Sequence, residues 1–264
     1  MACTQFQATH FEEEIQEDTL TNLVHAASDL QLSMPQRLWA AHQIVERSLL
    51  AGPEKCPFSV SNISTLPNLV ISMLDLAIES DRLPQIAVKV LWCVALHPEG
   101  AMILETNDAV PVILGILRGT EDALLAAPAV HFLEQMGRTR PSAVASHLSK
   151  AHAPQLLLRC LSRWQDSLEI VSGLLNLFAF ALQSSCRNMA EHAEYTERTQ
   201  KDESLRDAYR SSSSRVPQAL LHIAHGDIDT IENSERRKAW IVVRKTAAGL
   251  AREWKGISEL LTTG

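Results

Sequence analysis

The chain has few aromatic residues and few glycines. Aromatic side chains make up 5% of its 264 residues, and only ten glycines are present. Strands favour aromatic and β-branched residues, whereas the abundant leucine and alanine favour helices. Apolar residues still reach 46% and charged residues 21%, enough to build a core. This composition argues against disorder over the whole length and indicates an all-α protein.

A basic excess, a long apolar run and paired cysteines are also absent. The formal net charge of −7 argues against broad binding to nucleic-acid phosphates. The longest apolar run, residues 170–182, is shorter than the roughly 20 residues of a membrane-spanning helix. None of the five cysteines forms a C-x-x-C pair, and Cys93 and Cys160 lie in apolar runs, where we expect buried, reduced thiols. With no signal peptide at the N-terminus, we expect a soluble intracellular protein, cytoplasmic or nuclear, with no membrane partner.

One proline-led phrase recurs along the chain. Its first three prolines are 44 and 43 residues apart, and the fourth follows after 63. Proline is tolerated in the first turn of a helix, so each copy predicts a helix start. A weaker fifth copy, Leu20–Val24, has Thr21 at the proline position. The four full copies are Leu66–Val70, Val110–Leu114, Ala153–Leu157 and Val216–Leu220.

The weak copy at Leu20–Val24 and the first three full copies are each followed by a longer amphipathic pattern. Apolar residues recur at helical spacing, and a small residue lies near the middle of each pattern. Two copies are also preceded by a short helical segment, Glu99–Glu105 and Pro141–Ser149. The predicted long helices are Pro35–Leu50, Pro84–Leu96, Asp122–Gly137 and Asp166–Leu182.

The order of short, medium and long helices resembles that of armadillo-repeat proteins. The best copy reads Asn107-Asp108-Ala109-Val110-Pro111-Val112-Ile113-Leu114-Gly115-Ile116-Leu117, and the resemblance covers Thr19 to Trp254. It implies a right-handed α-solenoid of about five repeats, whose stacked faces form the core. HEAT repeats remain the alternative subtype. We expect one repeat domain over residues 19–264, after a flexible acidic arm over residues 1–18 that contains Glu12, Glu13 and Glu14.

A polar segment over about residues 191–215 accounts for the long last interval. It mixes charges of both signs and contains the run Ser211–Ser214, between Arg210 and Arg215. Such composition predicts an inserted surface loop. Phosphorylated serines could pair with the flanking arginines and order the loop, although a plain solvent-exposed loop is the interpretation that we favour.

Motifs for catalysis and metal binding are missing. The sequence has no glycine-rich phosphate loop, no G-x-S-x-G turn and no H-E-x-x-H helix. His222 and His225 are three residues apart, but no third ligand is placed near them by sequence. We therefore expect no enzyme activity, no cofactor and no metal. The basic cluster 236–238 with Arg244 and Lys245 could contact nucleic acid or act as an import signal, but we favour an exposed helix face.

The armadillo resemblance also implies where a partner binds. In that family the long helices line a groove, where an Asn contacts the peptide backbone and a Trp often lies one turn earlier. Asn176 matches that Asn, and the equivalent positions of the other repeats hold Gln135, Cys93 and Glu46. The positions one turn earlier hold Ser172, His131, Lys89 and His42. Because the ladder of Asn and Trp is incomplete and no acidic groove is indicated, the chain departs from the nuclear-import receptors of this family.

These observations favour a non-enzymatic adaptor or scaffold that binds a protein or peptide, within a hetero-oligomeric complex or alone. A second hypothesis is a chaperone cofactor of the nucleotide-exchange type, because some small armadillo proteins act in that way. A third is an enzyme or nucleotide sensor without recognisable motifs. Architecture alone is a weak guide to function, so the choice depends on the site.

Overall fold

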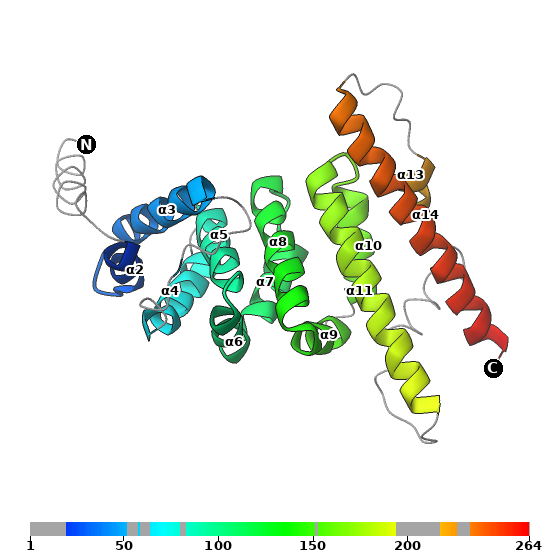
Figure 1. The fold of residues 1–264 in the computed structure, drawn as a ribbon, viewed down its shortest axis with the longest axis horizontal. Helices are drawn as coiled ribbons and strands as arrows, with labels where there is room; N and C mark the ends of the chain where they lie inside the picture. The colour runs from blue at the N-terminus through cyan, green and yellow to red at the C-terminus, as the bar shows by residue number, and fades with distance from the viewer. Residues whose placement is uncertain are drawn as a thin grey trace. The chain divides into compact units, whose positions relative to one another are not determined.

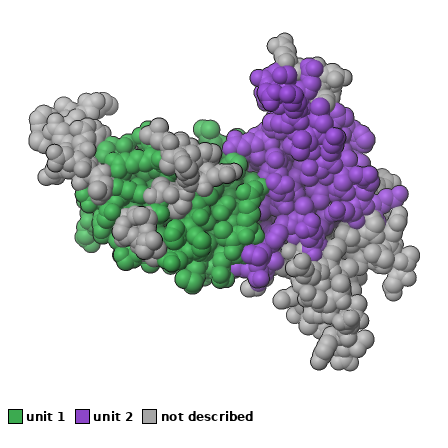
Figure 2. Space-filling model, in the orientation of Figure 1, with its two compact units in different colours: residues 1–140 green, residues 141–264 purple. Residues whose placement is uncertain are grey.

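A computed structural model describes residues 20–51, 58, 64–79, 83–150, 153–193, 217–225 and 233–263 (Figure 1). Twelve helices and no strand are present in these residues, which confirms the all-α prediction. The chain divides into two compact units, residues 1–140 and 141–264 (Figure 2). The predicted arm and most of the predicted inserted loop lie outside the described residues. That one repeat domain covers residues 19–264 stays a prediction.

The helices of unit 1 follow one another in pairs, and each pair packs against the next. The second helices of the pairs, α3, α5 and α8, contact one another in chain order, and α2 contacts α4, which contacts α7. The predicted order of a medium helix before a long one does not hold for α4 and α5, which have 14 and 12 residues. The short helix α6 packs against α4, α5, α7 and α8. The helices of this unit are α2 (Leu20–Ser28), α3 (Met34–Ala51), α4 (Leu66–Glu79), α5 (Pro84–Ala95), α6 (Pro98–Thr106), α7 (Ala109–Gly119) and α8 (Ala123–Thr139).

The proline-led phrases do begin helices. Pro67 and Pro111 lie in the first turns of α4 and α7, where a missing N–H leaves no hydrogen bond unmade. Polar side chains cap two other helices of unit 1. The Asp122 carboxylate accepts a hydrogen bond of 2.8 Å from the Leu124 N–H at the start of α8. The His97 imidazole accepts one of 3.2 Å from the Glu99 N–H at the start of α6.

A sharp turn joins α6 to α7. The two helices are bent by 77°, and Asp108 lies between them in the left-handed region with φ of 52°. Asp and Asn adopt that conformation more readily than other non-glycine residues. The turn lets α7 start beside α6, so that the apolar residues of both helices, such as Leu104 and Ile113, are buried in one core.

Unit 2 is built around the long helix α11, which contacts α9, α10 and α14. Phe178 of α11 stacks on Trp254 of α14, with ring centroids 5.7 Å apart and planes inclined by 22°. Pro217 comes directly before α13, and its carbonyl accepts a hydrogen bond of 3.0 Å from the Leu220 N–H. The helices are α9 (Pro141–Lys150), α10 (Ala153–Arg163), α11 (Leu168–Ala193), α13 (Gln218–His225) and α14 (Ser234–Thr263).

Helix α11 is longer than predicted. The sequence interpretation ended it at Leu182 and began the inserted loop at about residue 191, but the helix continues to Ala193. Residues 183–193 contain neither Gly nor Pro, and Ala, Met and Glu among them favour the helix. The helix thus extends to the approximate start of the predicted loop, which otherwise lies outside the described residues.

Candidate functional site

An aromatic pair joins the long helices α5 and α8. The rings of Trp92 and His131 are stacked, with centroids 5.3 Å apart and planes inclined by 26°. Both side chains are half-buried, whereas the neighbouring Leu91 and Phe132 are fully buried. The pair thus presents aromatic surface to solvent where the two helices meet. Trp and Tyr at such positions supply much of the energy of protein interfaces.

Polar groups surround this aromatic pair. His131 Nδ1 lies 3.6 Å from the Glu134 carboxylate, one turn away on α8. Gln135 Nε2 lies 3.5 Å from the carbonyl oxygen of Ala95, to which it donates a hydrogen bond at the limit of the usual range. That carbonyl belongs to the last residue of α5 and has no partner within its helix. The hydrogen bond of Gln135 therefore links α8 to the C-terminal end of α5.

The other predicted positions of unit 1 differ in exposure. His42 and Glu46 are exposed on α3, with His42 Nδ1 3.5 Å from the Glu46 carboxylate, and Gln43 Nε2 donates a hydrogen bond of 3.0 Å to Glu46. Lys89 is half-buried, three residues before Trp92 on α5. The side chain of Cys93 is 3% exposed, so it packs in the core and presents no surface to a partner.

In unit 2, Ser172 is half-buried and Asn176 is exposed on α11. Asn176 is followed by two buried residues and two half-buried ones, as is His131. The burial pattern around Asn176 thus resembles that around His131, and the pairing of Asn176 with Gln135 stays a prediction. The structure brings His131 together with Trp92, a residue that the sequence analysis did not single out.

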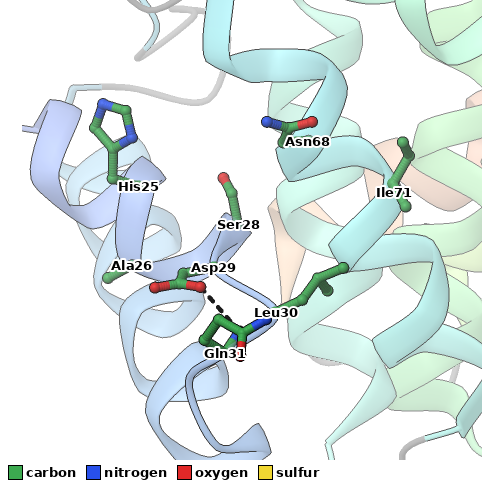
Figure 3. A pocket seen from close by; sticks show the side chains of 8 residues that line it. All are labelled: His25, Ala26, Ser28, Asp29, Leu30, Gln31, Asn68 and Ile71. Atoms are coloured by element: carbon green, nitrogen blue, oxygen red, sulfur yellow. Dashed lines mark hydrogen bonds between the residues drawn. The ribbon is translucent and has the colours of Figure 1, made fainter.

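A cavity of about 560 Å³ lies between the end of α2 and the start of α4 (Figure 3). Its walls combine the partly exposed apolar side chains of Leu30 and Ile71 with polar ones. Asp29 Oδ1 accepts a hydrogen bond of 2.8 Å from the Gln31 N–H at its edge. Sequence patterns did not indicate this cavity, because it is formed across a turn. Its lining residues are His25, Ala26, Ser28, Asp29, Leu30, Gln31, Asn68 and Ile71.

The predicted basic cluster is divided over the surface of α14. Lys238 and Lys245 are exposed, as expected for an outer helix face. Arg244 is half-buried, and its Nε donates a hydrogen bond of 2.9 Å to the carbonyl oxygen of Ala224 at the end of α13. Arg244 therefore serves the packing of α13 on α14, and the exposed lysines form the charged surface.

The groups that usually carry chemistry are scattered. Among the described residues, no three His, Cys, Asp or Glu side chains form a cluster able to hold a metal. His222 and His225 are both exposed on α13. Burial raises the pKa of the Cys160 thiol from 9.0 to about 11, against a smaller lowering by Arg163. A neutral, buried thiol is a poor nucleophile, so Cys160 is part of the core.

No single helix among the described residues is long and apolar enough to cross a membrane, although the bent pair α6 and α7 would satisfy length and composition together. Comparison with protein-family models and with curated proteins finds no match for this chain.

Proposed function

We propose that the chain is a right-handed α-solenoid of about five armadillo-like repeats, which binds a protein or peptide segment as a non-enzymatic adaptor. The order of helices within each unit supports this proposal. A shorter helix is followed by a longer one in α2–α3, α7–α8, α10–α11 and α13–α14, whereas α4, with 14 residues, precedes the 12-residue α5. In unit 1, the second helices of successive pairs contact one another, and so do the first helices, as stacked repeats require.

The stacked pair of Trp92 and His131 carries the proposal of a binding surface. A half-buried Trp that is not needed to fill the core offers a large contact area, and its neighbours Glu134 and Gln135 offer polar groups for orientation. Long helices that pack side by side place such residues on one continuous face. An extended or helical segment of a partner would lie across α5 and α8, with an apolar or cationic side chain against the indole.

A displayed peptide library selected on the immobilised full chain tests the proposal. Peptides bound by the wild-type chain should bind Trp92→Ala at least about tenfold more weakly, because truncating an interface Trp costs more than about 1.4 kcal/mol. The double variant Gln135→Ala with Asn176→Ala tests the positions taken from the armadillo resemblance. Met102→Ala is the matched control, since Met102 is a large apolar side chain that is 49% exposed on α6, outside the two helices that carry the aromatic pair.

Two outcomes would overturn the proposal. One is selection of peptides whose affinity is unchanged by Trp92→Ala. The other is equal loss of affinity in Met102→Ala, which would place the binding surface elsewhere. Thermal unfolding of each variant separates lost contact from lost structure, because the half-buried indole should contribute less to stability than a fully buried one.

A further inference from the structure

The last helix, α14, carries a stripe of cations on its exposed side. Lys238, Lys245 and Arg252 are each seven residues apart and all exposed. Seven residues make nearly two helical turns, so the three side chains point in almost the same direction, about 10 Å apart. Exposed Val242, between the first two, is 63% accessible to solvent. We call these four residues the α14 stripe.

The opposite side of α14 is buried within unit 2. Trp254 stacks on Phe178 of α11, and Val243, Ala247 and Leu250 are also buried. The α14 stripe is therefore not needed for packing. Figure 1 shows α14 beside α11 and α13, the helices that its inner side contacts.

The charge of α14 opposes that of the whole chain. Residues 234–255 contain seven cationic and two acidic side chains, whereas the chain has a formal charge of −7. Lys238 Nζ forms an ion pair of 2.8 Å with Glu235, and both are widely exposed. Within the described part of the chain, Lys245 and Arg252 have no carboxylate partner. Such a stripe attracts an acidic ligand, and Val242 offers an apolar contact beside the charges.

Among the segments outside the described residues that lack a cation, residues 11–18 carry the most carboxylates. Residues 11–18 read Phe-Glu-Glu-Glu-Ile-Gln-Glu-Asp, with five carboxylates, two apolar residues and no cation. Residues 226–232 also lack a cation but carry only three carboxylates, and residues 194–216 have as many cations as carboxylates. The phosphates of a nucleic acid would also be attracted to the α14 stripe, but the negative charge of the remaining chain would repel them.

We propose that the α14 stripe binds the acidic segment 11–18 of a second copy of this chain. The choice of a second copy rests on the proposed repeat order, because the first and last repeats of a solenoid are its two ends. The acidic side chains would pair with Lys238, Lys245 and Arg252, and Phe11 or Ile15 would contact Val242. Such head-to-tail contact uses different surfaces on the two copies, so it produces rings or open chains of copies.

Light scattering after gel filtration of the full chain tests the inference. At about 50 mM NaCl the measured mass should exceed that of a monomer, and at about 500 mM it should fall to the monomer mass, because salt screens exposed charges. Lys245→Glu with Arg252→Glu should weaken association at least about tenfold. Glu12→Lys, Glu13→Lys and Glu14→Lys should do the same, and combining both sets should restore it.

The matched control is Arg138→Glu with Arg159→Glu, two exposed cations on α8 and α10 that change the net charge equally. The inference is overturned if the wild-type chain stays monomeric at low salt, or if this control weakens association as much as the stripe variant. It is also overturned if the stripe binds duplex DNA and the chains do not associate. Trp92→Ala should leave association unchanged, so failure of the proposed peptide-binding surface is seen separately.

Discussion

The hydroxyl of Ser72 donates a hydrogen bond of 2.6 Å to the carbonyl oxygen of Ala27, 45 residues earlier in the chain. The same hydroxyl accepts a bond of 3.1 Å from Arg37 Nη1. Ser72 is fully buried, and Ala27 lies in the last turn of α2, where carbonyl groups lack partners within the helix. One small side chain of α4 thus connects α2 and α3 to the next helix pair.

Ser72→Ala should lower the free energy of unfolding by about 1–3 kcal/mol, because it leaves the Ala27 carbonyl and the Arg37 guanidinium without this partner. Urea denaturation followed by circular dichroism measures the change. Ser48→Ala is the control. The Ser48 hydroxyl is also buried, but it donates over 2.9 Å to Ile44 one turn earlier in its own helix. That loss should stay below about 0.5 kcal/mol, since alanine favours helices. Equal losses would contradict the structural role of Ser72.

Gly100 should not tolerate a side chain. A Cβ at this position would lie 2.2 Å from the Val94 carbonyl oxygen at the end of α5, so α6 would have to move. Gly100→Ala should therefore destabilise unit 1 by about 1–3 kcal/mol. Gly115→Ala should instead raise the stability of the chain. A Cβ added at Gly115 would meet no atom within 4 Å, and alanine favours the helix over glycine by up to about 1 kcal/mol. Thermal melts of the two variants should shift in opposite directions, and a shared direction would refute the argument.

The helix starts were the most predictable feature of the fold. Proline and the caps act through neighbouring backbone, so Pro67 and Pro111 could be read without knowledge of the tertiary structure. The pair of Trp92 and His131 could not, because it joins residues from two helices and depends on how far each helix is rotated. The spacing of apolar residues alone leaves that rotation uncertain by one turn. The cavity beside Ile71 escaped prediction for the same reason, since a turn and a distant helix form its walls.

Asp108 holds a backbone conformation that most side chains resist. Its φ of 52° lies in the left-handed region, at the turn from α6 to α7. Asp108→Val should destabilise the chain by about 1–2 kcal/mol, because a β-branched side chain is strained there. Asp108→Gly should be neutral or slightly stabilising, since glycine adopts this conformation without strain. Chemical denaturation of both variants measures the difference, and a valine variant as stable as the glycine variant would exclude strain at this turn.

Cys160 makes stability depend on pH in the alkaline range. Burial raises the pKa of its thiol from 9.0 to about 11, so the folded chain holds this proton more tightly than the unfolded chain does. Below about pH 9 both states are protonated and the contribution to stability is constant. Between about pH 9 and 11 the unfolded state loses the proton first, and the free energy of unfolding should fall by up to about 1.4 kcal/mol per pH unit.

The difference between the wild-type chain and Cys160→Ala isolates this contribution, because other titrating groups are common to both. The stability of the alanine variant should decrease less over the same pH range. Iodoacetamide gives a second measurement: at about pH 8 the thiolate fraction of native Cys160 should be about a hundredfold below that of the unfolded chain, and alkylation should be slower by at least that factor. Peptide mapping locates the alkylated cysteine. Rapid alkylation of Cys160 in the native chain would show that the thiol is exposed and that its pKa is not raised. Helix α10 would then have to pack on another face.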